Sequence, residues 1–304
     1  MSKQKTETKI DIDLPSLIER FGNEEHCRRY LELLRWHNMI ECPRCASDKI
    51  SRIVKRNQFD CDSCRYQFSV TTGTVLHDTH LPLWKWFLTA YMMIVAKKGV
   101  SANQIKRTLG VSYRTAWYLC HRIRKAMESV NGAPLSGTVE VDETFIGGKL
   151  RHVGTGHGLR NKTMVVGALQ RDGEIRLRIE KRNDRRTLHK FIKDNTLDET
   201  EKIYTDALPS YDGIEDHNTQ HESVDHNIEE WVRGDVHTNG IEGVWSLLKR
   251  SIVGSYHQVS KKHLDRYLDE FQFRFNNRKN EFMFRDTIMR LIETPTLTYA
   301  ALTA

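Results

Sequence analysis

Hydrophobic and polar positions follow two different periods along this chain. From Leu14 to Trp36, and again over residues 82–130, apolar residues recur with a helical spacing. From Gly137 onward they alternate or run together over short stretches, as strands do, in TVEVDETFIGG, TMVVGALQ and EIRLRIE. The pattern predicts helices in the first half of the chain and a sheet at the start of the second half.

The second half then changes between the two periods. DRRTLHKFIKDN has a helical spacing, KIYTD is typical of a short strand, and residues 237–252 and 260–276 are again helical. The order β-β-β-α-β-α-α predicts a mixed α/β domain.

Composition adds a preference for an anionic partner. Lys and Arg number 47 against 40 Asp and Glu, so the formal net charge is +7. This balance favours a polyanion such as nucleic acid without proving one. The longest apolar run, WFLTAYMMIVA, is too short to span a bilayer, and MSKQKTETK lacks the apolar segment of a secretory signal. We therefore expect a cytoplasmic protein with no membrane partner.

Four of the six cysteines form two CxxC pairs that are separated by fifteen residues. Zinc takes four soft ligands in a tetrahedron, and two such pairs joined by a hairpin supply them. The sequence predicts a closed, structural Zn²⁺ site in a zinc ribbon. Its ligands are Cys42, Cys45, Cys61 and Cys64.

A second motif lies in SANQIKRTLGVSYRTAWYLCHRIRKAM. Ser101 and Ser112 are predicted N-caps of two helices, and Gly110 is predicted to end the first. Two helices joined by a tight glycine turn are typical of a helix-turn-helix, although an ordinary helical hairpin with a solvated basic face has the same pattern. The residues predicted to face DNA are Tyr113, Arg114, Arg122, Arg124 and Lys125.

Three carboxylates stand at unusual places. Asp142 lies on the same side of the strand TVEVDETF as Glu140, and a carboxylate in a central strand is costly unless its charge is compensated. Asp206 ends the strand KIYTD and either joins a site there or caps ALPSY. Glu242 opens an amphipathic helix, where it either serves a site or forms a capping box with Asn239.

Taken together, the three carboxylates predict a metal site. If Asp142 and Asp206 are brought side by side by parallel strands, and Glu242 lies across from them, their repulsion requires divalent cations between them. Oxygen ligands favour Mg²⁺ or Mn²⁺, and two such ions activate a hydroxyl and stabilise the leaving oxygen of a phosphodiester. Lys249, two helical turns after Glu242, is predicted to orient DNA.

These residues carry a family resemblance. Asp142 in VEVDETFIGG, Asp206 in IYTDALPSY and Glu242 in HTNGIEGVWSLLKR resemble the DDE signature of bacterial insertion-sequence transposases. The zinc ribbon and the segment GSYHQVSKKHLDRYLDEFQFRFNNR are similar to those of insertion-sequence family fifteen-ninety-five. The resemblance implies a ribonuclease-H-like catalytic domain that nicks DNA hydrolytically and then transfers the strand. It leaves open whether Asn239 contributes to the metal site.

Two other functions were weighed. His263 and Arg266 fit the HxxR element of tyrosine recombinases, but the only suitably placed tyrosine is Tyr299 in the last residues of the chain. A non-catalytic zinc-ribbon and helix-turn-helix DNA-binding regulator is the other alternative, and the three carboxylates argue against it.

The sequence analysis therefore predicts a multidomain DNA transposase, associated with the nucleoid. Its expected partners are transposon-end DNA, target DNA and further copies of itself, as a dimer or higher assembly on DNA. The predicted parts are an N-terminal helical region at 1–36, a zinc ribbon at 37–75, a helix-turn-helix DNA-binding domain at 80–132, an α/β ribonuclease-H-like catalytic domain at 137–290 and a tail at 291–304.

Overall fold

The structure is a computed structural model of the whole chain. It describes residues 12–37, 39–128, 132–147, 162–197, 202–215, 219–224 and 232–304. The chain forms two compact units. The helical unit comprises residues 1–128 together with 277–304, and the α/β unit comprises residues 129–276.

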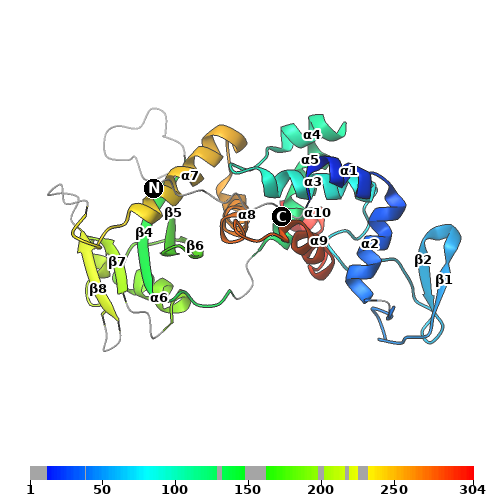
Figure 1. Cartoon of the computed structure of the whole chain (residues 1–304), viewed down its shortest axis with the longest axis horizontal. Helices are drawn as coiled ribbons and strands as arrows, with labels where there is room; N and C mark the ends of the chain where they lie inside the picture. Colours follow the sequence, from blue (N-terminus) through cyan, green and yellow to red (C-terminus); the bar gives the residue numbers. More distant parts are fainter. Residues whose placement is uncertain are drawn as a thin grey trace, which may run out of the picture. The chain divides into compact units, whose positions relative to one another are not determined.

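The described part of the helical unit contains helices and one small antiparallel sheet (Figure 1). Its helices are α1 (Leu14–Phe21), α2 (Glu24–Trp36), α3 (Leu83–Val95), α4 (Ala102–Leu109), α5 (Tyr113–Ala126), α9 (Met283–Glu293) and α10 (Tyr299–Thr303). Its strands are β1 (Ile50–Ile53), β2 (Gln58–Cys61) and β3 (Gln67–Phe68), with a 3-10 turn at Val54–Arg56 between the first two.

The core of the helical unit contains residues from both the N-terminal and the C-terminal part of the sequence. Phe284 of α9 lies 6.0 Å, ring centre to ring centre, from Phe21 of α1 and from Phe87 of α3. Because α9 packs with α2, α3 and α5, the predicted catalytic domain at 137–290 is too long at its C-terminal side. The predicted tail at 291–304 is also not a tail, because it completes α9 and forms α10 within this unit.

No helix in the described ranges is both long and apolar enough to cross a membrane. The apolar run WFLTAYMMIVA lies in α3, where Trp86, Phe87 and Met93 are buried. This run therefore supplies the core of the helical unit, as its length predicted.

The α/β unit is built on one mixed sheet. Its strands are β4 (Thr138–Ile146), β5 (Thr163–Gln170), β6 (Ile175–Glu180), β7 (Lys202–Asp206) and β8 (Gln220–Val224). Its helices are α6 (Arg185–Asn195), α7 (Asn239–Ser251), which continues into a π-helical turn at Ile252–Tyr256, and α8 (Leu264–Asn276). Short 3-10 turns lie at Pro209–Tyr211 and Lys261–His263.

The sheet has the order β6-β5-β4-β7-β8. β4, β5 and β6 pair antiparallel, whereas β7 and β8 continue the sheet in parallel with β4. The mixed sheet confirms the predicted α/β class. The predicted order does not include β8. Its sequence QHESV is polar and has no apolar alternation that would indicate a strand.

Alternation along β4 separates two cores, one on each face of the sheet. Val139 and Val141 pack with α6, and the apolar stripe of α7, which includes Ile241 and Trp245, packs on the opposite face (Figure 1). The predicted core-facing stripe of this helix is thus confirmed. Consequently, the even-numbered side chains Glu140 and Asp142 of β4 face α7, a placement on which the candidate site depends.

Two amide side chains of α8 cover the outer edge of β6. Gln272 accepts a hydrogen bond from the Leu177 backbone N–H at 2.7 Å. Asn276 accepts from the Ile175 N–H at 2.8 Å and donates to the Ile175 carbonyl at 3.1 Å. An edge strand with open backbone groups invites pairing with another chain, so these side chains hold α8 in place and close that edge.

Candidate active site, zinc site and nucleic-acid surface

The four cysteines of the ribbon converge on one point. Their sulfur atoms all lie within 4.8 Å of one another, with Cys42 to Cys64 at 3.7 Å and Cys45 to Cys61 at 3.5 Å. Zinc–sulfur bonds of about 2.3 Å in a tetrahedron require sulfur atoms roughly 3.8 Å apart. The quartet therefore fits Zn²⁺, as predicted.

The backbone forms this quartet from two similar turns. After the first pair, Ala46 has φ 56° and donates its N–H to the Cys42 carbonyl at 2.9 Å. After the second pair, Arg65 also has φ 56° and donates to the Cys61 carbonyl at 2.8 Å. Each left-handed residue turns the chain back, so that both cysteines of a pair face the same point.

In the α/β unit, strand pairing places two of the predicted carboxylates opposite each other. β4 and β7 are parallel, and Glu140 pairs with Tyr204. This pair is the last one between the two strands. Two residues further along each strand, the same register would place Asp142 beside Asp206. Asp206 also accepts a hydrogen bond from the Leu208 N–H at 3.3 Å, so it begins the turn into ALPSY as well.

The electrostatics of Asp142 agree with this placement. Burial, together with the neighbouring charges of Asp206 and Glu143, raises the pKa of the Asp142 carboxyl from its usual value to about 7. Because the charge of Asp206 raises the pKa of Asp142, the two carboxylates are close enough to repel, and a cation between them would relieve this repulsion.

Helix α7 contacts this pair through Trp245. The indole N–H of Trp245 donates to Asp142 Oδ2 at 2.9 Å. Gly167, which pairs with Asp142 across β4 and β5, makes room for the ring, because a Cβ there would lie 2.5 Å from a Trp245 ring carbon. Trp245 therefore has two roles, as part of the apolar stripe of α7 and as a hydrogen-bond donor to Asp142. The signal for its second role is a tryptophan three residues after Glu242 on the same helix.

Glu242 lies on the exposed side of α7, three residues before Trp245. The helix begins after Thr238, whose hydroxyl donates to Glu242 Oε1 at 3.2 Å, so the alternative of a capping box with Asn239 as N-cap is wrong. Lys249 is also exposed on α7. Within the described ranges, the only cluster of three or more Cys, His, Asp or Glu side chains close enough to hold one metal is the cysteine quartet. The structure thus brings Asp142 to Asp206 but does not gather Glu242 with them.

A hydrogen bond on the other face of β4 holds the segment after Asp206. The hydroxyl of Tyr211, which is fully buried, donates to Glu143 Oε2 at 2.7 Å. Burial raises the pKa of Glu143, and the charge of Asp206 contributes to the rise. Because Glu143 follows Asp142 and Tyr211 closely follows Asp206, this bond fixes the two strand ends relative to each other.

Glu140 docks the start of α7. Its carboxylate is 1% exposed and accepts hydrogen bonds from Arg171 Nε and from the Ile241 backbone N–H, each at 2.9 Å. Arg171 also donates to the carbonyl of His237 at 3.1 Å, and His237 Nδ1 lies 3.4 Å from the Glu140 carboxylate. On the side of β4 that carries Asp142, the charge of Glu140 could be compensated by a metal or by a cation. The structure shows the ion pair, and its effect is to position the helix that carries Glu242.

The predicted two-helix motif is present in the helical unit. Ser101 and Ser112 cap α4 and α5, and Gly110 joins them with φ 63°. Tyr113 and Arg114 are exposed at the beginning of α5, where a recognition helix contacts bases.

Two of the predicted DNA-facing residues of α5 are not on its surface. Arg122 is 5% and Arg124 1% exposed, so neither lies on the exposed face of α5 on which the prediction placed them. The reason is that most residues in the second half of α5 are buried, whichever side of the helix they lie on, which the helical period does not reveal. Lys125 is half-buried and pairs with Glu128. Sequence analysis instead missed Lys106 and Arg107, which are exposed on α4.

Comparisons with known proteins agree with these sites. Residues 134–276 match the ISXO2-like transposase domain, and residues 22–67 match the transposase zinc-ribbon domain. The chain belongs to this transposase family. The transposase-domain match falls within the α/β unit that carries Asp142 and Asp206, and the zinc-ribbon match includes all four cysteines.

Two relatives of this transposase-family chain have names that refer to a transposable element or a transposase. It is 28% identical over 275 residues to an uncharacterized protein in transposable element ISH50 of Halobacterium salinarum, which covers 84% of this chain and 92% of that protein. It is 31% identical over 75 residues to an uncharacterized transposase-like protein of Haemophilus influenzae, over 25% of this chain and 59% of the relative.

Proposed function

We propose that this chain is a DNA transposase that binds the terminal inverted repeats of an insertion sequence, cleaves there and transfers the strand into target DNA. The observation that carries the proposal is that Asp206 lies close enough to Asp142 for its charge to raise the pKa of Asp142, each two residues beyond the last pair of β4 and β7, in a domain of the transposase family. The mixed sheet with helices on both faces supports the proposal that this domain is ribonuclease-H-like.

Asp142, Asp206 and Glu242 would hold two Mg²⁺ or Mn²⁺ ions. The raised pKa of Asp142 supports a cation at this place, since a buried carboxylate beside a second carboxylate is stabilised in its charged form by divalent metal. When bound, such ions supply an activated hydroxyl and stabilise the leaving oxygen of a phosphodiester.

The residues around these carboxylates have their own tasks in this proposal. The Trp245 indole fixes the rotamer of Asp142, and the Glu143–Tyr211 bond fixes the strand ends. Glu140 anchors α7, so that a rotation of the exposed Glu242 side chain completes the metal site. Lys249, also exposed on α7, contacts a DNA phosphate near the reacting bond.

DNA is recognised by the helical unit in this proposal. The zinc ribbon and the exposed start of α5 bind the element's ends, with Tyr113 and Arg114 at base edges or phosphates. Joining two ends to one target requires at least two copies of the chain on DNA. A non-catalytic regulator would have no use for two half-buried carboxylates close to each other, so that alternative is less well supported.

The substitution Glu242→Gln tests the catalytic assignment. Glutamine still accepts the Thr238 hydroxyl bond, so the helix start is kept, but one charged metal ligand is lost. We expect strand transfer to fall by about 100-fold or more, because a lost metal ligand removes several kcal/mol of transition-state stabilisation.

The assay uses end-containing duplex DNA with Mg²⁺ or Mn²⁺, and with EDTA as the metal-free control. Glu19→Gln removes the same charge from an exposed position of α1. This variant serves as the matched control and should keep full activity. Full strand transfer by Glu242→Gln would show that Glu242 is not a ligand. Cleavage in EDTA would refute the metal mechanism altogether.

A further inference from the structure

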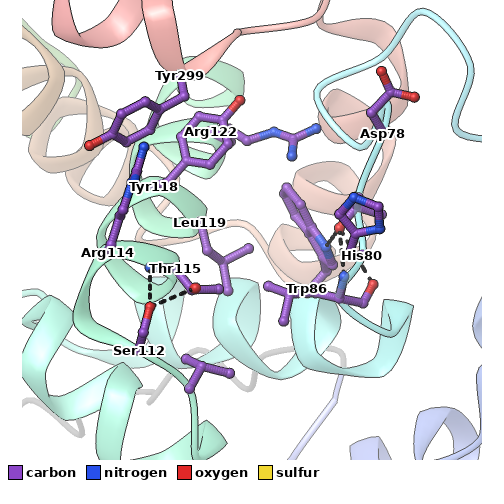
Figure 2. Close-up of a pocket in the computed structure, with 13 residues that line it drawn as sticks. Asp78, His80, Trp86, Ser112, Arg114, Thr115, Tyr118, Leu119, Arg122 and Tyr299 are labelled. Atoms are coloured by element: carbon purple, nitrogen blue, oxygen red, sulfur yellow. Dashed lines mark hydrogen bonds between the residues drawn. The ribbon is translucent and has the colours of Figure 1, made fainter.

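A pocket of about 520 Å³ lies inside the helical unit, at the beginning of α5 (Figure 2). The loop before α3, the first half of α5 and Tyr299 of α10 form its walls. Its volume falls within the range of small-molecule sites, which is about 300–1,000 Å³. The site of the proposed cleavage chemistry, in the α/β unit, shares no residue with it.

Arg122 is the unusual residue of this pocket. Its side chain lines the wall and is only 5% exposed. The guanidinium lies 4.8 Å from the ring centre of Trp86 and 5.1 Å from that of Tyr118. Figure 2 shows it between these two rings. The guanidinium is therefore held in place without a counter-charge from either neighbour.

The hydrogen bonds of Arg122 are incomplete. One terminal N–H donates to the His77 carbonyl at 2.6 Å, but Nε is buried and has no hydrogen-bond partner among the described residues. No described carboxylate lies within 4.0 Å of the guanidinium, and Asp78 acts on it only from a longer range. A buried cation without a paired anion lowers the stability of the fold. An anion from outside the chain, bound beside Arg122, would compensate this charge.

The rest of the pocket indicates which anion. Arg114 adds a second guanidinium, 4.2 Å from the ring centre of Tyr299, and it is exposed. Leu119 and Val111 add apolar surface beside the aromatic rings. Bare phosphate would leave most of this volume and its apolar lining unused, whereas a nucleotide offers a phosphate for arginine and a planar base for the rings.

We propose that this pocket binds one nucleotide unit, with its phosphate against Arg122 and Arg114 and its base against the apolar and aromatic lining. The inference builds on the proposed DNA-binding role of the helical unit, because the nucleotide would come from an unpaired DNA end held beside α5. A free nucleotide has the same chemistry and is the second possible source.

Calorimetric titration of the full chain tests the pocket itself. The probes are dAMP, deoxyadenosine and inorganic phosphate, at constant ionic strength. We expect saturable binding of dAMP, and binding of deoxyadenosine and of phosphate at least about tenfold weaker, since each lacks one half of the recognised unit. Equal affinities of dAMP and deoxyadenosine, or no saturable binding of dAMP, would overturn the proposal.

Three variants separate the pocket from general charge effects. Arg122→Gln and Arg114→Gln should each weaken dAMP binding by about tenfold or more, as expected for a lost charged hydrogen bond. Arg186→Gln removes the same charge from an exposed position of α6 and should not change the affinity. Because Arg114 is exposed, its variant keeps the test valid if Arg122→Gln fails to fold. Unchanged affinity in the Arg114 variant, or in a folded Arg122 variant, would refute the site.

A second titration identifies the source of the nucleotide. Duplex DNA with three unpaired terminal nucleotides is compared with the blunt duplex of the same sequence. If the chain binds the frayed duplex more tightly than the blunt one, and Arg122→Gln abolishes this difference, the pocket binds DNA ends. If the chain binds both duplexes equally but still binds dAMP, the pocket binds free nucleotide. Metal-dependent cleavage, measured separately, depends on Asp142 in the other unit, so failure of the pocket leaves the proposed function testable.

Discussion

At the scale of single residues, Asp142 combines a half-buried position, a carboxylate neighbour and a tryptophan donor. The Trp245 indole N–H and the Glu143 backbone N–H occupy one oxygen each, at 2.9 and 2.8 Å. These two bonds favour the ionised form, but burial outweighs them and raises the pKa of Asp142 to about 7. The side chain is therefore held in one orientation while its charge stays poorly compensated by the protein.

Asp142 should make the stability of the metal-free protein depend on pH. Its pKa is about 7 in the folded chain against an ordinary value of 3.8, so between these values the folded state binds more protons than the unfolded state. The free energy of unfolding should consequently fall as pH rises from about 4 to about 7, by up to about 4 kcal/mol.

Urea denaturation in EDTA at several pH values measures this effect. Asp142→Asn cannot ionise, so the difference in unfolding free energy between wild type and variant should shrink towards low pH and favour the variant at pH 8. Saturating Mg²⁺ should restore stability to the wild type alone. A constant difference across the pH range would contradict the burial of this charge.

At the scale of elements, the site depends on how α7 is held against the sheet. Glu140 anchors the first turn of the helix, and Trp245 reaches Asp142 across the space left by Gly167. The strand thus contributes one carboxylate that docks the helix and another for the proposed chemistry, two residues apart on the same face.

Gly167→Ala should disturb this packing. The new Cβ would lie 2.5 Å from a Trp245 ring carbon, and overpacking of this kind typically costs about 1–3 kcal/mol. We expect a lower melting temperature and reduced strand transfer.

A second substitution separates packing from orientation. Gly167→Ala combined with Trp245→Leu removes the clash, so stability should recover, but the indole donor to Asp142 is lost and strand transfer should stay low. Recovery of both properties would mean that Trp245 acts only by filling space.

The zinc ribbon is a second element with its own prediction. Cys61→Ser removes one of four thiolates, so elemental analysis should show loss of zinc and the affinity for end DNA should fall. The α/β unit has its own core and should keep its folding and its response to Mg²⁺. Zinc content equal to that of the wild type would refute the ligand assignment.

At the scale of the whole molecule, the chain leaves its N-terminal helices, forms the complete α/β unit and then returns to the helical unit with α9 and α10. The last 28 residues, 277–304, therefore belong with the first 128. Stability of the helical unit should therefore depend on a segment that follows the α/β unit in sequence.

Phe284→Ala tests this organisation. Phe284 is 2% exposed between Phe21 and Phe87, and truncating a buried phenylalanine typically costs about 3–5 kcal/mol. Hydrogen exchange should accelerate in α1, α3 and α9, while amides of β4 and β5 keep their protection. Equal acceleration in both units would show that they unfold as one.

The sequence by itself determined those features of this protein that depend on residues close together in the chain. The two CxxC pairs, the serine caps of α4 and α5, the turn at Gly110 and the apolar stripe of α7 all follow from short-range spacing, and the structure has each of them. Spacing succeeds here because a knuckle, a cap or a helix face involves residues within a few positions of each other.

Contacts between distant segments were decided only by the tertiary structure. Nothing in the helical period of α5 distinguishes the exposed Arg114 from the buried Arg122, because burial depends on what packs around the helix. The same holds for Trp245 on Asp142, Glu140 at the start of α7 and α9 in the helical unit. Periodicity identifies which side of an element is apolar, whereas the partner that covers it is chosen by packing over the whole chain.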